Sequence, residues 1–232
     1  MIGLVHSFIY DFIYGETMDK GEPRMLQPFR HSIKDQTPVY VFVAVLFLMG
    51  VVFGALMVNA LTLEQQQDIS RYLGNFFISV NEGSGEFVTQ SYWTVAGLHL
   101  KWLGLIWLLG LSVIGLPGIL VLDFLKGVLI GFTVGCLVGQ FTWKGLLFAL
   151  VSIAPHNLIV IPALLISSVA AVGFSLGIIR NRVLLNTTKN TARPFLSYTG
   201  LTIAMAAVLL AVSSFETWVT PVMMSWVTPS IK

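Results

Sequence analysis

Long runs without charged residues are the feature that most restricts what this chain can fold into. Five almost uncharged, apolar runs cover residues 39–63, 102–122, 127–143, 145–179 and 195–218. A helix of roughly 20 apolar residues crosses the hydrocarbon core of a bilayer. Because backbone polar groups must be satisfied internally in lipid, such runs form helices there. The runs therefore predict an all-α, polytopic membrane protein.

The composition agrees with a lipid environment. Charged residues make up 10% of the 232 residues and apolar residues 56%, whereas a soluble domain has roughly 25% charged residues. A net charge of +2 without a basic stripe argues against nucleic acid as a partner. The single cysteine, Cys136, excludes an intrachain disulfide and a cysteine metal cluster. The lipid bilayer is thus the expected surrounding.

The run 145–179 is too long for one span. As a helix its 35 residues would extend for about 52 Å. Pro155, His156, Asn157 and Pro162 interrupt it, and a proline removes a backbone donor and clashes with the carbonyl four residues earlier. We expect a short re-entrant segment near 145–153, a break, and a full span over about 158–179. This interpretation predicts five spans.

The basic residues set the expected orientation. With five spans, one side receives the N-terminal tail, a turn at 123–126 and the loop 180–194, which together hold nine Lys and Arg residues against four on the other side. The positive-inside rule then places the N-terminus in the cytoplasm and the C-terminus outside. We expect a cytoplasmic extension over 1–38 and a membrane domain over 39–232, with an outer loop at 62–101.

Small residues recur at four-residue spacing within the spans, which lets another helix backbone approach closely. The glycines concerned are Gly50, Gly54, Gly127, Gly131, Gly135, Gly139, Gly173 and Gly177. Three interpretations stay open for them. They could serve packing within one bundle, a contact between copies of this chain in a homo-oligomer, or a glycine-lined conduit.

Polar residues at membrane depth are few. His156 and Asn157 lie at the predicted break, where they could form a functional site or could satisfy carbonyls that the prolines release. Asp123 and Lys126 are spaced i, i+3, and we expect them to form an ion pair at the membrane boundary.

The outer loop contains one amphipathic helix. Its apolar stripe at helical spacing comprises Ile69, Tyr72, Leu73, Phe76 and Phe77. A turn at 81–85 and an aromatic stretch follow, which together predict a helical hairpin on the outer face. The stripe could pack against the protein's own spans, or it could form a docking surface for extracytoplasmic proteins.

Motifs of catalysis are missing from the sequence. It contains no P-loop, no dinucleotide-binding glycine motif, no HExxH and no GxSxG. The four histidines lie in different segments, and the carboxylates do not pair for acid–base chemistry. We therefore predict no enzymatic activity, no cofactor and no metal site.

Three stretches resemble the stage II sporulation protein M family. They are VYVFVAVLFLMGVVFGALMVN at 39–59, GLIWLLGLSVIGLPGILVLDFLKGVLIGFTVGCLVG at 104–139 and IAPHNLIVIP at 153–162. The resemblance extends from about Ile33 to the C-terminus, and its most specific element is the run FLKG at 124–127 followed by GFTVG at 131–135.

The resemblance implies a role in engulfment during sporulation. It implies a membrane scaffold that recruits and localises two extracytoplasmic cell-wall hydrolases, stage II sporulation proteins P and D. These would act on peptidoglycan at the septum and at the engulfing membrane of the mother cell. The alternative is a membrane subunit of a transporter or channel, with a site at the broken helix around Pro155 to Pro162.

Overall fold

A computed structural model describes residues 27–82, 91–112, 115–179 and 192–227, and every regular element among them is helical. The elements are α2 (Gln27–Met57), the 3-10 turn η1 (Val58–Ala60), α3 (Leu63–Glu82), α4 (Tyr92–Gly110), α5 (Gly115–Ser152), α6 (Ala154–Ile179), α7 (Ala192–Trp218) and α8 (Thr220–Val227). Helices long and apolar enough to cross a membrane cover Thr37–Ala60, Tyr92–Gly110, Gly115–Ser152, Ala154–Ile179 and Pro194–Trp218. The predicted all-α fold with five spans is confirmed for these residues.

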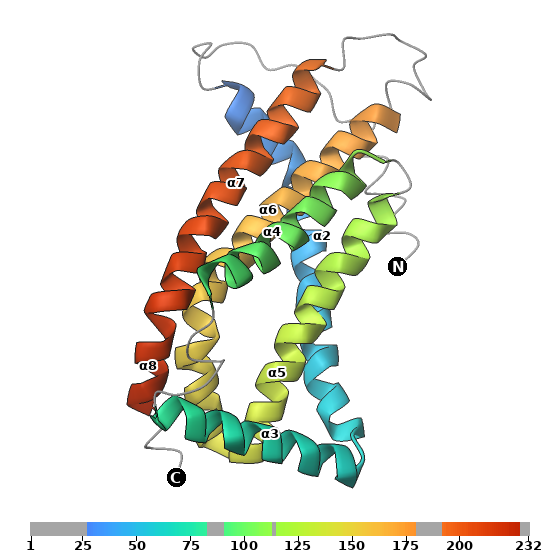
Figure 1. Ribbon diagram of the computed structural model, residues 1–232. Helices are drawn as coiled ribbons and strands as arrows, with labels where there is room; N and C mark the ends of the chain where they lie inside the picture. The colour runs from blue at the N-terminus through green and yellow to red at the C-terminus, as the bar shows by residue number, and fades with distance from the viewer. Residues whose placement is uncertain (1–26, 83–90, 113–114, 180–191, 228–232) are drawn as a thin grey trace. The chain divides into compact units, whose positions relative to one another are not determined.

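The chain divides into two units between Phe42 and Val43, within α2. In the second unit α6 packs against α4, α5 and α7 (Figure 1). Half of the residues in the membrane-spanning stretch of α6 are buried inside the protein, a larger share than in the other spans. The outer faces of the spans remain apolar. On α2, for example, Leu48, Val52 and Leu56 are about 60% exposed at four-residue spacing, which suits contact with lipid tails.

The second and third spans have different bounds from those that the uncharged runs predict. The chain turns at Leu111 and Ser112, not between Asp123 and Lys126, which both lie inside α5. Lys101 likewise lies inside α4, so the connection that was expected over 62–101 ends at Ser91. The prediction treated each charge as the end of a helix, whereas these helices continue through them.

The turn between α4 and α5 depends on glycine. A Cβ atom on Gly115 would overlap the carbonyl group of Leu109. Gly115 N–H donates to the carbonyl of Ser112 at 3.0 Å, which closes this short connection.

A kink lies within α5, ahead of the short segment that was expected near 145–153. Within α5 the direction changes at Thr142, whose φ of 52° is the only positive value of a non-glycine residue in the described part of the chain. Residues 143–152 then fold back on the end of the preceding helix. Gly145 meets the backbone of Leu137 so closely that a Cβ atom would overlap its carbonyl oxygen.

The prolines do not end the fourth span. One turn residue, Ile153, separates α5 from α6, and α6 begins at Ala154 instead of near residue 158. Pro155 therefore falls in the first turn of α6, where a helix has no partner for the N–H that proline lacks. Pro162 lies inside α6, which continues through it.

The amphipathic helix expected after the first span is α3. It starts with a capping box: Thr62 N–H donates to Gln65 Oε1 at 3.0 Å, and Gln65 N–H donates to Thr62 Oγ1 at 3.3 Å. Figure 1 shows α3 crossing the end of the bundle at which α5 turns into α6, and α3 contacts α8 there. Of the predicted turn at 81–85, residues 83–85 lie outside the described residues, as do residues 180–191 of the loop 180–194.

Candidate functional site

A polar cluster joins three spans near one end of the bundle. It consists of His99 on α4, His156 on α6 and Glu216 on α7. His99 Nε2 lies 2.9 Å from Glu216 Oε2, and His156 Nε2 lies 3.9 Å from Glu216 Oε1. The side chains are mostly buried, at 6% exposed for His99, 13% for His156 and 24% for Glu216. Because a carboxylate only accepts hydrogen bonds, His99 Nε2 is the donor.

The neighbouring hydrogen bonds define the role of His156 Nε2. Asn157 Nδ2 donates to the carbonyl of Ile153 at 2.9 Å and to His156 Nε2 at 3.0 Å. His156 Nε2 is therefore an acceptor, and its 3.9 Å approach to Glu216 is no hydrogen bond. The Nδ1 atoms of His99 and His156 are both buried and have no hydrogen-bond partner among the described residues.

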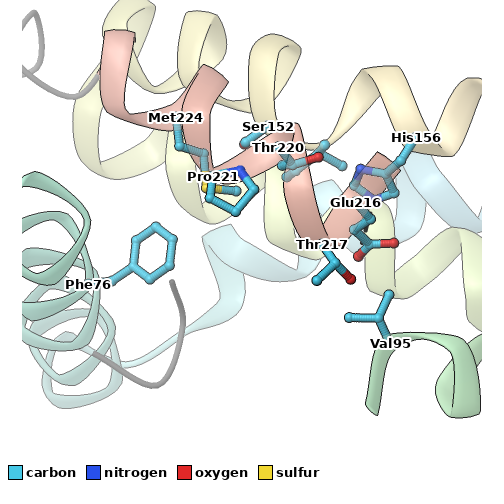
Figure 2. Close-up of a pocket in the computed structure, with 10 residues that line it drawn as sticks. Phe76, Val95, Ser152, His156, Glu216, Thr217, Thr220, Pro221 and Met224 are labelled. Atoms are coloured by element: carbon cyan, nitrogen blue, oxygen red, sulfur yellow. Dashed lines mark ion pairs between the residues drawn. The ribbon is translucent and has the colours of Figure 1, made fainter. Parts of the chain in front are cut away.

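A cavity of about 180 Å³ lies beside the cluster (Figure 2). Its walls come from the ends of α3, α4, α5, α6 and α7 and from the start of α8. The lining residues are Phe76, Val95, Ser152, Ile153, His156, Glu216, Thr217, Thr220, Pro221 and Met224.

A second buried polar contact joins α5 to α6. Ser168 Oγ donates to Asp123 Oδ1 at 2.8 Å, and the two residues are 0% and 4% exposed. The ammonium of Lys126 lies 5.3 Å from the centre of the Trp102 ring, a cation–π arrangement. The predicted ion pair between Asp123 and Lys126 is therefore wrong, because each side chain has found a partner on another helix.

The glycines of α2 and α5 form one close helix contact, here called the α2–α5 glycine interface. A Cβ atom on Gly50 or Gly54 would overlap the α5 backbone at Phe124 or Val128. Added Cβ atoms on α5 would meet α2 in the same way: the contacts are Gly127 with Phe47, Gly131 with Val51, and Gly135 with Ala55 and Val58. Packing within one bundle, the first of the three interpretations, accounts for these five positions.

The remaining glycines behave differently. A Cβ atom on Gly139 would lie 3.6 Å from Val58, an ordinary contact distance. On Gly177 it would meet no described atom within 4 Å. Gly173 is half-buried on α6.

Comparison with known proteins identifies the family. The family model of stage II sporulation protein M matches residues 43–221, more than half of the chain. The chain belongs to the stage II sporulation protein M family. It is thus a sporulation-related, multi-pass membrane protein. No curated protein and no solved structure gives a significant match. The match to the stage II sporulation protein M family covers the polar cluster, the α2–α5 glycine interface and α3.

In this member of the stage II sporulation protein M family, the apolar stripe of α3 packs mainly against the protein itself. Phe77 is 8% exposed, and its ring centre lies 4.9 Å from that of Phe141 and 4.8 Å from that of Phe148. Phe76 lies edge-on to Phe148 at 6.1 Å. Phe76, Phe77, Phe141 and Phe148 are called the α3 aromatic cluster below.

The other members of the stripe are less covered. Leu73 packs against the same core, and Ile69 is half-buried. Tyr72 is 58% exposed. Of the two roles left open for the apolar stripe, packing against the protein's own spans accounts for most of it, because the bundle covers Phe77 and Leu73.

The sequence pattern singled out His156 and Asn157 but did not point to His99 and Glu216. His99 and Glu216 are 117 residues apart, and neither lies in a motif. The prediction took Lys101 as the end of a loop and therefore assigned His99, two residues earlier, to that loop. Because α4 includes both residues, His99 belongs to a span.

Proposed function

We propose that this protein is a non-enzymatic membrane scaffold of sporulation that recruits and localises extracytoplasmic peptidoglycan hydrolases. Family membership supports the connection to sporulation. The observation that carries the scaffold role is α3, a helix outside the spans that the α3 aromatic cluster holds against the end of the bundle. A helix held in this way presents its opposite side as a rigid surface.

The proposed docking surface is the polar side of α3. Its members are exposed and lie opposite the apolar stripe on the helix: Glu64, Gln67, Asp68, Arg71, Asn75 and Ile78. Arg71 and Asp68 form an ion pair at 3.4 Å on this side, and Ile78 adds an apolar group that is 55% exposed. A polar rim around one apolar residue is a common composition for a protein interface.

The proposed orientation places α3 on the extracytoplasmic side of the cell membrane. Lys101 and Lys126 lie inside spans, so they no longer count toward either side. The remaining basic residues are distributed eight against three, in favour of the side with the N-terminus and the loop 180–194. The positive-inside rule makes that side cytoplasmic. The proposed location is the septal and engulfing membrane of the mother cell, and the proposed partners are stage II sporulation proteins P and D.

Position-specific photo-crosslinking tests this proposal in sporulating cells. A photoreactive residue at Asn75 or Ile78 is expected to capture one of the two hydrolases. The same residue at Leu196, which is 68% exposed near the start of α7, is the control and is expected to capture neither. The double variant Arg71→Glu with Ile78→Ser is expected to lose hydrolase co-purification at unchanged membrane levels. Absence of crosslinks together with unchanged co-purification would show that α3 is not the docking surface.

A second candidate is a transporter or channel subunit, and one observation favours it. The polar cluster and the Asp123–Ser168 contact place ionisable groups inside spans, where such residues often mark transport pathways. The double variant His156→Leu with Asn157→Ala separates the two candidates. A scaffold retains hydrolase capture and engulfment in this variant, whereas a transport subunit loses flux and, with it, engulfment. Thermal unfolding of the purified variant checks that it is folded.

A further inference from the structure

Two hydroxyl oxygens and a carboxylate that line the cavity beside Glu216 can accept hydrogen bonds from a ligand, while His156 Nδ1 and Thr220 Oγ1 are buried without a partner among the described residues. Ser152 Oγ donates its hydrogen to the carbonyl of Phe148 at 2.7 Å, and Thr217 Oγ1 donates to the carbonyl of Ser213 at 2.8 Å. Each hydroxyl has one hydrogen, so only lone pairs remain on these two oxygens. Both residues line the cavity.

Glu216 adds a charged acceptor. Its Oε2 atom is occupied by His99, whereas Oε1 lies 3.9 Å from His156 Nε2, which is itself an acceptor. Two acceptors thus approach each other with no hydrogen between them. Lys126 acts on Glu216 electrostatically, but its ammonium lies over Trp102 and forms no ion pair with Glu216 among the described residues.

An unpartnered hydroxyl lies in the same cavity. Thr220 is 4% exposed, and its Oγ1 atom has no hydrogen-bond partner in the described part of the chain. Buried polar atoms of this kind usually have a partner. A group inside the cavity would supply it.

We infer that this cavity binds a primary ammonium group carried on a short apolar stem. An ammonium has three N–H donors and one positive charge, which match the acceptors and the charge of Glu216. The rest of the wall suits an aliphatic stem, since it consists of Phe76, Val95, Ile153, Pro221 and Met224. The volume of about 180 Å³ is adequate, because an engineered protein cavity of about 150 Å³ holds benzene.

A metal ion fits the cavity less well. No group of three His, Cys, Asp or Glu side chains among the described residues is arranged to hold a metal ion. The ammonium could belong to a free amine or to a lysine side chain of another protein. The inferred ammonium site depends on neither the scaffold role nor a transport role, because it is argued from the cavity alone.

Ligand-dependent thermal unfolding of the purified full-length protein tests the inference. The probes are n-butylammonium and N-acetyl-lysine methylamide, and their matched controls are n-butanol and the Nζ-acetylated lysine compound. At least one amine is expected to raise the Tm with increasing concentration, and the neutral controls are not. A shift with n-butylammonium alone assigns a free amine, and a shift with the lysine compound assigns a side chain. Equal shifts with n-butanol, or no shift with either amine, would overturn the inference.

Two variants test separately the charge of Glu216 and the free volume of the cavity. Glu216→Gln removes the charge and is expected to weaken amine binding at least tenfold. Val95→Met keeps the polar cluster but fills part of the cavity, and it is expected to abolish binding. It provides an independent test if Glu216→Gln does not fold. The control is Glu64→Gln, the same substitution at an exposed position on α3, and this variant is expected to bind the amine as tightly as the parent protein does. Undiminished binding by Glu216→Gln and Val95→Met would also overturn the inference.

Discussion

At the scale of single residues, Gly131 permits the closest part of the α2–α5 glycine interface. A Cβ atom there would overlap the carbonyl of Val51 on α2. Backbone atoms of a packed helix cannot move aside cheaply, so Gly131→Ala is expected to destabilise the fold by about 1–3 kcal/mol. Reversible unfolding in mixed micelles measures the change.

The control for this substitution lies on α4. A Cβ atom on Gly104 would meet nothing within 4 Å, so Gly104→Ala is expected to leave the stability unchanged or to raise it by up to about 1 kcal/mol, since alanine favours a helix over glycine. Equal effects of Gly131→Ala and Gly104→Ala would mean that α2 and α5 do not approach as described.

Two adjacent serines of α6 allow a matched test of the Asp123 contact. Both are buried, but Ser168 Oγ donates to Asp123 on another helix, whereas Ser167 Oγ donates at 2.8 Å to the Ala163 carbonyl of its own helix. Ser168→Ala removes the hydrogen bond that Asp123 Oδ1 receives, so it is expected to cost about 1 kcal/mol more than Ser167→Ala. Unfolding in mixed micelles compares the two variants, and equal losses would contradict a role of Ser168 in holding α5 to α6.

The residue-level outcome shows what spacing alone can and cannot predict. The four-residue spacing of Gly127, Gly131 and Gly135 predicts a close helix contact, because it places small residues on one face. The same spacing at Gly173 and Gly177 is followed by open space at Gly177. Spacing indicates that a face could be approached, and only the arrangement of the neighbouring helices decides whether it is.

At the scale of elements, α3 depends on the α3 aromatic cluster for its position. Truncation of a buried Phe in a core costs about 3–5 kcal/mol, and Phe77 is the most buried member of the α3 stripe. Phe77→Ala is therefore expected to release α3 from the bundle and to speed amide hydrogen exchange over Leu63–Glu82. Ile78→Ala, at a neighbouring position that is 55% exposed, is expected to leave the exchange unchanged. Slow exchange in Phe77→Ala would show that other contacts hold α3.

The helix bounds were harder to predict than the number of helices. The stripe of α3 was predictable because one face is buried and the other is not. The ends of α4 and α5 were not, because the partners that Asp123 and Lys126 meet inside the bundle, Ser168 and Trp102, lie far away in the sequence. A charge marks the end of a span only when no partner meets it inside the bundle. The polar cluster was missed for the same reason.

At the scale of the whole molecule, an odd number of crossings is expected to place the two ends of the chain on opposite sides of the membrane. Moving the bounds of the second and third spans leaves the number of candidate spans at five, so the expected sidedness of every later loop is unchanged as well. Under the positive-inside rule we then expect the loop 180–194 to be cytoplasmic, since this loop holds four Lys and Arg residues and no acidic residue.

Single-cysteine labelling in intact cells tests this topology. In a Cys136→Ser background, Ser84→Cys and a cysteine added after Lys232 are expected to react with a membrane-impermeant maleimide. Thr187→Cys is expected to react only after the cells are opened, because the positively charged loop remains inside. Labelling of Thr187→Cys in intact cells would invert the molecule and place α3 in the cytoplasm. The cavity beside Glu216 would then lie near the cytoplasmic face, because α3, the turn between α5 and α6, and α8 share one end of the bundle (Figure 1).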